Sequence, residues 1–123
     1  MAIPHLPYPA PIEAYGKGGF RFAGMSHRGS LLCLPSGITA WPVTAPAEIA
    51  DENLAQVWAV AAQLDLFLIG TGRDMAFLAT PLRDLFREAG IKVEPMQTGP
   101  AISTYNLLLG EGRRVGAGLI AVE

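Results

Sequence analysis

The residues with the clearest chemical potential lie in the second half of the chain, first of all in a glycine turn. Gly70-Thr71-Gly72 directly follows an apolar run at residues 66–69. In open α/β sheets, ligands bind at the carboxyl ends of strands, so this turn is a candidate contact for an anion or small molecule. The alternative is a tight turn whose backbone conformation requires glycine, with no role in binding. The segment completes neither a dinucleotide fingerprint nor a P-loop.

A second candidate site spans a predicted helix and the charged segment after it. Helical spacing places Tyr105 on an apolar face and points Asn106 away from most of that face. The charged residues just past the helix end can bind a carboxylate or phosphate, or can form an internal Glu–Arg bridge that caps the helix. Successive strand residues point to opposite sides, so only one of the two arginines is expected to serve any one site. The candidate residues are Tyr105, Asn106, Glu111, Arg113 and Arg114.

The other reactive residues form no complete catalytic or metal-binding set. His5 and His27 have no second ligand at helical spacing, and one cysteine cannot complete a zinc site. The Ser26-His27 pair lacks a GxSxG elbow. Cys33 lies among leucines, where a thiol behaves as a small hydrophobic residue. We therefore expect no metal, no cofactor and no catalytic residue, and the balance is against an enzyme.

Length and composition narrow the class of protein. The 123 residues suffice for one domain. Half of them are apolar, which argues against disorder, and a net charge of −2 argues against nucleic-acid binding. No run approaches the ~20 apolar residues of a membrane span, and the N-terminus lacks a signal-peptide pattern. A single cysteine calls for no oxidising compartment, so a cytoplasmic protein is the default expectation.

The predicted secondary structure changes from strands to a helix near Pro46. Four prolines in residues 1–11 predict a flexible arm, either frayed or lying along the domain surface. Alternating patterns and glycine turns over residues 12–42 predict a meander of antiparallel strands. Residues 54–64 then follow the spacing of one helix face, with Asp51 as the expected N-cap.

Strands and helices alternate through the rest of the chain. Strands are predicted at residues 66–69, 91–94 and 115–122, and a helix at 80–89 has Thr80 as N-cap and Pro81 at its first position. The last helix runs from Gly99-Pro100 to Gly110. This alternation predicts one α/β domain over residues 12–123, with right-handed crossovers and a mixed, mainly parallel sheet flanked by helices.

Five segments in order also match a known pattern. They are residues 12–15 with Gly18-Gly19-Phe20, Leu34-Pro35-Ser36-Gly37 with Trp41, Ile69-Gly70-Thr71-Gly72, Met96-Gln97-Thr98 with Ala101, and Thr104-Tyr105-Asn106-Leu107-Leu108 with Glu111, Arg113, Arg114 and Val115. Together they resemble the Mth938-like domain family, which includes the mitochondrial NADH dehydrogenase (complex I) assembly factor 3 proteins. Ser103 departs from the family pattern, which commonly has an arginine there.

The resemblance implies a three-layer fold, with a central mixed sheet, helices and an additional N-terminal antiparallel β layer. It also implies an uncharacterised, non-enzymatic assembly factor, here a bacterial member whose protein partner belongs to membrane-associated assembly machinery. In this hypothesis an acidic partner segment docks at the polar site formed by Tyr105, Asn106, Glu111, Arg113 and Arg114. The alternative is a small-molecule or anion-binding domain, with or without catalysis, whose Gly70–Gly72 site lies near those charged residues. A purely structural or oligomeric role is a third hypothesis.

Overall fold

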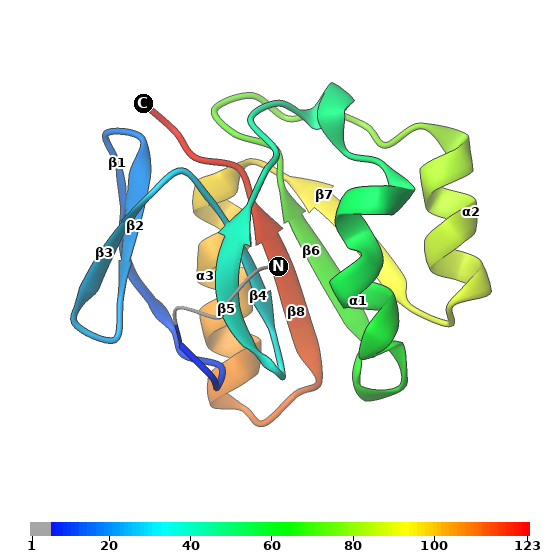
Figure 1. Cartoon of the computed structure of the whole chain (residues 1–123), viewed down its shortest axis with the longest axis horizontal. Helices are drawn as coiled ribbons and strands as arrows, with labels where there is room; N and C mark the ends of the chain where they lie inside the picture. The colour runs from blue at the N-terminus through cyan, green and yellow to red at the C-terminus, as the bar shows by residue number, and fades with distance from the viewer. Residues whose placement is uncertain (1–5) are drawn as a thin grey trace.

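The computed structural model describes residues 6–123, in which eight strands form two sheets (Figure 1). The first sheet has the order β1-β2-β3 and is antiparallel. The second has the order β5-β4-β8-β6-β7, with β4 antiparallel to β5 and β8, and β6 parallel to β8 and β7. The strands are β1 Ile12–Gly16, β2 Gly19–Phe22, β3 Met25–Arg28, β4 Ser30–Leu34, β5 Gly37–Trp41, β6 Leu66–Gly70, β7 Lys92–Met96 and β8 Val115–Leu119.

The N-terminal strands do not form one meander, because they divide between the two sheets at Gly29. β3 is largely exposed, whereas β4 is buried along its whole length. A strand that is apolar on both faces needs cover on both sides, so β4 enters the central sheet together with β5. That sheet therefore has two parallel and two antiparallel strand pairs, where a mainly parallel sheet was expected. The mixed sheet and the additional N-terminal β layer are confirmed.

The helices differ from the expected ones mainly at their starts. The predicted helix over 54–64 is split, with α1 Ala55–Ala59 between the 3-10 turns η2 Asp51–Leu54 and η3 Ala61–Gln63. Asp51 does not cap it, because its carboxylate accepts a hydrogen bond from Trp58 Nε1 at 2.7 Å. A further 3-10 turn, η1, covers Pro46–Glu48.

The remaining two helices lie close to their predicted ranges. In α2, Thr80–Glu88, Thr80 is the first helical residue and Ala79 is the N-cap, while the expected Pro81 in the first turn is confirmed. α3, Thr98–Gly110, begins one residue before the predicted start.

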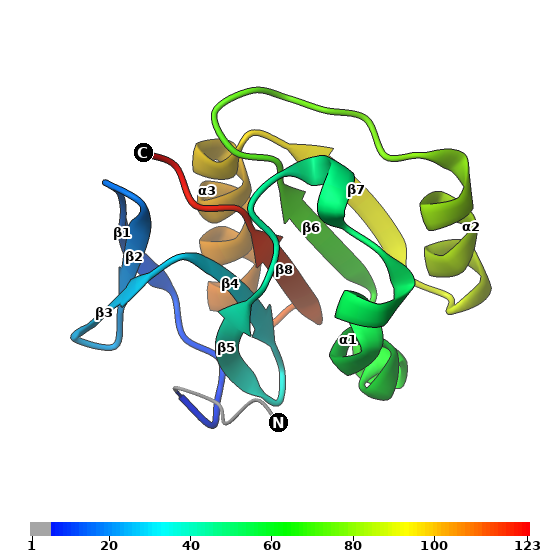
Figure 2. The ribbon, with the colours of Figure 1, turned by 45° about the horizontal axis from the view of Figure 1, so that its top comes forward.

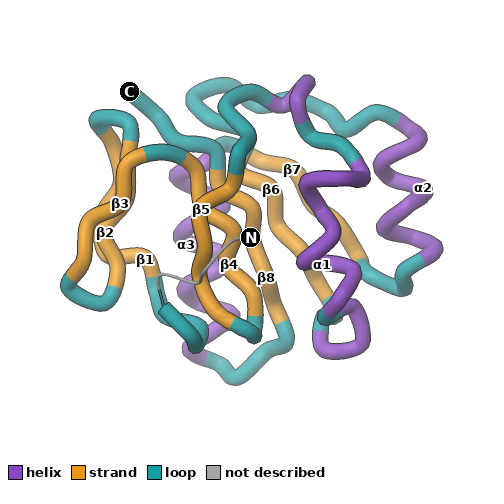
Figure 3. The backbone as a smooth tube through the Cα atoms, viewed as in Figure 1, coloured by secondary structure: helices purple, strands orange, loops and turns teal. Residues whose placement is uncertain are grey.

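Each face of the central sheet is covered by a different layer (Figures 2 and 3). Leu31 and Cys33 of β4 face a core shared with α3 and the three-stranded sheet, which contributes Phe20 and Phe22. Leu32 and Leu34, which alternate with them, face a second core beneath α1 and α2, which includes Phe86 on α2. Alternation along one buried strand thus supplies both cores.

The described part of the predicted N-terminal arm, residues 6–11, lies along the domain. Leu6 and Ile38 exchange two backbone hydrogen bonds, of 3.3 and 2.9 Å, and Leu6 is buried. Residues 1–5, including His5, lie outside the described residues.

Gly118 on β8 lets the second core close around Trp41. A Cβ at Gly118 would stand 2.7 Å from two atoms of the Trp41 ring, well inside ordinary contact. The Trp41 ring is itself held in place, because Nε1 donates to the Asn53 carbonyl at 2.9 Å. The ring therefore cannot move aside without losing a hydrogen bond.

We predict that Gly118→Ala lowers the free energy of unfolding by about 1–3 kcal/mol, the usual cost of overpacking a core. Urea denaturation followed by tryptophan fluorescence measures it. Gly110→Ala is the matched control, since a Cβ there meets nothing within 4 Å, and its stability should be unchanged or raised. A Gly118→Ala protein as stable as the wild type would contradict this account of β8.

Candidate functional site

The two groups of predicted site residues lie at opposite ends of the central sheet. β6 and β8 run parallel, with Leu66 paired to Val115 and Gly70 paired to Leu119. The Gly70–Gly72 turn therefore follows the carboxyl end of β6, whereas Arg113 and Arg114 precede the amino end of β8 (Figure 1). A five-residue strand separates the two ends by roughly 13 Å. The expected proximity of the glycine turn to the charged residues is wrong.

The polar groups of the Gly70–Gly72 turn bind the protein itself. The Thr71 N–H donates to the Met96 carbonyl at 2.7 Å, and the Gly72 N–H donates to Thr98 Oγ1 at 2.9 Å. Thr98 is fully buried and its hydroxyl donates in turn to the Ile120 carbonyl at 2.8 Å. These bonds join the carboxyl ends of β6, β7 and β8, so an anion could take the two amides only by breaking them.

A hollow of about 440 Å³ lies beside this turn, and its walls come from three separate segments. Met75, one of its lining residues, is exposed, and so is Phe77, to 82%. The segments that line the hollow are residues 44–46, 71–76 and 120–123.

Tyr105 is a core residue, with no exposed surface. Its hydroxyl donates to the Ala10 carbonyl at 3.2 Å and lies near the Cys33 thiol. Burial raises the pKa of Tyr105 above its usual range, and burial also raises the pKa of Cys33 to about 12. Both groups are therefore neutral at pH 7, and Tyr105 contacts no partner while the fold is intact.

Asn106 joins the N-terminal sheet to α3. Its amide oxygen accepts from the Ile12 N–H and its amide nitrogen donates to the Ile12 carbonyl, both at 2.8 Å. This pair of bonds imitates a strand partner for Ile12 at the start of β1. Both polar groups of the Asn106 side chain are therefore occupied by hydrogen bonds within the protein.

The two arginines have different surroundings. Arg114 Nη2 and Nε donate to the two carboxylate oxygens of Asp65 at 2.8 and 3.2 Å, so the ion pair of this segment involves Asp65 and not Glu111. Arg113 forms no ion pair with any residue in 6–123 and lines a hollow of about 320 Å³, whose other walls include Leu109. Glu111 is exposed at the end of α3.

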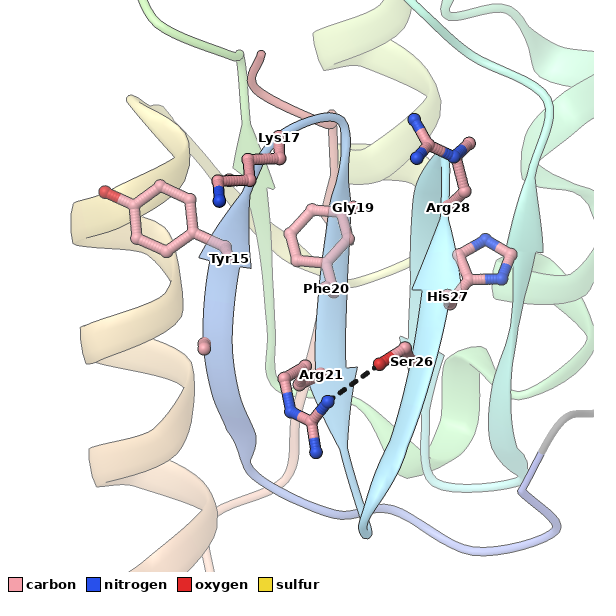
Figure 4. Close-up of a pocket in the computed structure, with 10 residues that line it drawn as sticks. Tyr15, Lys17, Gly19, Phe20, Arg21, Ser26, His27 and Arg28 are labelled. Atoms are coloured by element: carbon pink, nitrogen blue, oxygen red, sulfur yellow. Dashed lines mark hydrogen bonds between the residues drawn. The ribbon is translucent and has the colours of Figure 1, made fainter.

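A further site escaped the sequence reasoning, on the outer face of the three-stranded sheet. Lys17, Arg21 and Arg28 stand around a hollow of about 410 Å³ there (Figure 4). The signal was present in the alternation of residues 19–28, which turns Phe20 and Phe22 inward and Arg21 outward. What the alternation did not show was that β1, β2 and β3 form a separate sheet with an open face.

The described residues contain neither a metal-binding cluster nor a membrane-spanning helix. Within residues 6–123, no three His, Cys, Asp or Glu side chains come together in a way that could hold a metal ion. None of the helices described there is long and apolar enough to cross a membrane.

We predict that Asn106→Ala lowers the free energy of unfolding by about 2 kcal/mol, because it leaves both polar groups of Ile12 without their partner. Chemical denaturation measures the loss. Ser103→Ala is the control, since Ser103 is exposed on the same helix and should change stability little. Equal stabilities of the two variants would show that the Asn106 bonds do not hold β1.

We also predict a pH-dependent effect of Arg114→Ala. Hydrogen bonds from Arg114 lower the pKa of Asp65 in the folded protein. The pair therefore stabilises the fold above the unfolded-state pKa of aspartate, about 3.9, and this stabilisation disappears as the pH falls through the lower folded-state pKa. The wild type should exceed Arg114→Ala in stability at pH 7, and the difference should shrink as the pH falls below the unfolded-state pKa of aspartate. NMR titration should show a higher Asp65 pKa in the variant, and an unchanged pKa would contradict the ion pair.

Known proteins resemble this chain over most of its length. A family model described as a protein of unknown function (DUF498/DUF598) matches residues 12–120. An uncharacterized protein of Rhodobacter capsulatus is 43% identical over 110 residues, which cover 89% of this chain and 83% of that protein. The NADH dehydrogenase (ubiquinone) 1 alpha subcomplex assembly factor 3 of Mus musculus is 31% identical over 115 residues, 94% of this chain. The chain spans 62% of the length of that mouse protein.

Solved structures show the same fold. The crystal structure of a Bartonella henselae protein, described as an outer membrane protein, has a TM-score of 0.93 at 48% identity and covers 97% of this chain and 100% of its own. A Bordetella pertussis protein described as a Mth938-like domain has a TM-score of 0.79 at 28% identity, covering 90% of this chain and 85% of its own. The fold class and the family resemblance are thereby confirmed. The chain belongs to the DUF498/DUF598 family, and its fold is that of a Mth938-like domain.

Proposed function

We propose that this chain is a non-enzymatic protein-interaction module that assists the assembly of a membrane-associated respiratory complex. The observation that carries the proposal is the similarity to a NADH dehydrogenase assembly factor over 94% of this chain. The similarity spans 115 residues, so the shared part has the size of a whole folded domain. Under this proposal the protein is bacterial and cytoplasmic, and it meets the membrane through its partner.

The hollow at Arg113 is the surface that we assign to the partner. Pro9, Pro35, Leu109 and Val115 give it apolar walls, and Arg113 supplies a guanidinium with all of its hydrogen-bond donors available for a ligand. An acidic partner segment with one apolar side chain complements this combination of charge and wall. The partner's carboxylate would bind Arg113, because Arg114 is already held by Asp65.

Affinity capture tests both the function and the surface. We predict that the tagged protein captures a specific partner from a detergent-solubilised membrane fraction, and that Arg113→Ala weakens this capture about ten- to a hundredfold. A charge-assisted hydrogen bond contributes about 1.5–3 kcal/mol, which corresponds to that range. The measurement is the affinity of the purified partner for each variant.

Arg83→Ala is the matched control, since Arg83 is an exposed arginine on α2, away from the hollow. It should capture the partner as well as the wild type does. Full capture by a folded Arg113→Ala protein would contradict the assigned surface. A lack of any specific partner in both the soluble and the membrane fraction would contradict the assembly function itself.

A further inference from the structure

We propose that the outer face of the three-stranded sheet binds a ligand bearing a phosphate or diphosphate group, at a site that the proposed assembly function does not use. The site is the hollow of about 410 Å³ across β1, β2 and β3, hereafter the basic hollow (Figure 4). Its volume lies within the usual range for small-molecule sites. It is lined by Ala14, Tyr15, Gly16, Lys17, Gly19, Phe20, Arg21, Ser26, His27 and Arg28.

The charge of the basic hollow runs against that of the whole chain. The chain carries nine basic and eleven acidic residues, for a net charge of −2. Three of those nine basic residues line this one hollow, and none of its ten lining residues is acidic. Lys17, Arg21 and Arg28 are all exposed, and none forms an ion pair with another residue in 6–123. Such a concentration of one charge attracts anions to the hollow.

The strand register places Arg21 and Arg28 on the same face of the sheet. Arg21 on β2 pairs with Ser26 on β3, and Arg28 lies two residues further along β3 on the same face. The two arginines are therefore diagonal neighbours, about 7–8 Å apart at the backbone, within reach of long side chains. Their guanidinium groups extend in different directions, that of Arg21 over Ser26 and that of Arg28 toward Gly18, where the Glu123 carboxylate also lies (Figure 4). An anion on this face is attracted by both positive charges.

Two glycines lie in the row of the sheet that holds Arg28, and Gly16 leaves open space there. Gly16 and Gly19 pair with each other across β1 and β2, and Gly19 pairs with Arg28 across β2 and β3. This row therefore carries one side chain, that of Arg28, and its floor is backbone. A Cβ at Gly16 would meet nothing within 4 Å, so a ligand can approach the sheet closely there. A Cβ at Gly19 would stand 2.3 Å from the His27 carbonyl oxygen, so Gly19 instead allows β3 to pack closely against β2.

Arg21 is already oriented for binding. Its Nη1 donates to Ser26 Oγ at 2.9 Å, which fixes the guanidinium over β3 (Figure 4). A guanidinium has five N–H donors, so four remain for a ligand, and the Ser26 hydroxyl keeps its own proton to donate. Little side-chain entropy is then lost when an anion binds.

A phosphate group matches this donor set better than a carboxylate does. It carries a charge of about −1.5 to −2 and presents three acceptor oxygens. Two arginines, one lysine and a hydroxyl can share these three oxygens, whereas a single carboxylate carries one charge and two oxygens. The proposed ligand class is therefore a phosphate ester or diphosphate, free in solution or on a lipid headgroup.

NMR titration with inorganic pyrophosphate tests the proposal on the intact chain. We predict saturable shifts of the backbone amides from Gly16 to Gly19 and at Arg21 and Arg28, beyond those that chloride causes at the same ionic strength. Arg21→Ala and Arg28→Ala should each weaken binding about tenfold or more, because each removes a charge-assisted hydrogen bond. Both arginines are exposed, so the variants should fold, and their melting temperatures check this.

Arg87→Ala is the charge-matched control, since it removes an exposed arginine from α2, and it should bind pyrophosphate as the wild type does. Sedimentation with vesicles of phosphatidylcholine and phosphatidic acid distinguishes the sources. Vesicle binding that depends on Arg21 and Arg28 supports a lipid headgroup. Pyrophosphate binding without vesicle binding supports a soluble phosphate ester. No saturable shift, equal binding by the Arg21→Ala protein, or tighter binding of poly-glutamate would overturn the proposal. Partner capture by Arg113 is measured separately and is unaffected by any of these results.

Discussion

The whole architecture depends on one constraint, which is that the central strands are buried on both faces. β4 and β8 are buried along their full length and β6 along all but its first residue. Each buried backbone group must be hydrogen-bonded, and each apolar side chain must be covered from above or below. The sheet satisfies the first requirement through ladders on both sides of β4, β8 and β6. The second requirement demands two further layers, which are α1 with α2 on one face and α3 with the three-stranded sheet on the other.

This constraint explains why several promising polar residues prove to be structural. A layer made of both a helix and a small sheet must be joined, and Asn106 joins it by bonding both polar groups of Ile12. The backbone groups at the carboxyl ends of the central strands also need partners, and Thr98 accepts a hydrogen bond from Gly72 and donates one to Ile120. Polar side chains with specific spacing can therefore mark hydrogen bonds between elements of the fold as readily as a binding site. The burial of a residue and its partners distinguish the two.

The fold was predictable from the sequence to the extent that local patterns determine it. The Leu66–Gly70 strand, the Pro81 helix start and the last helix follow from apolar runs, proline geometry and helical spacing. The register was not predictable in the same way, since Leu66 meets Val115 only through contacts distant in the sequence. That register separates the glycine turn from Arg113, and no local signal contains it. Likewise Arg21 and Arg28 are ordinary exposed residues of short strands until the two hairpins place them on one face.

The position of α3 separates the two surfaces that remain for ligands. The basic hollow lies at the end of the sheet where the ring of Tyr15 sits against Gly99, in the first turn of α3, and a side chain at Gly99 would clash with the Tyr15 hydroxyl. Arg113 lies beyond the other end of the same helix, whose 13 residues span about 20 Å. Charges that far apart are screened from each other at physiological salt, where the Debye length is about 8 Å. Neither surface shares a lining residue with the other. A ligand in the basic hollow can therefore influence a partner at Arg113 through the packing of the fold and not through direct charge interaction. The Asn106 bonds to Ile12 are one connection of this kind between the three-stranded sheet and α3.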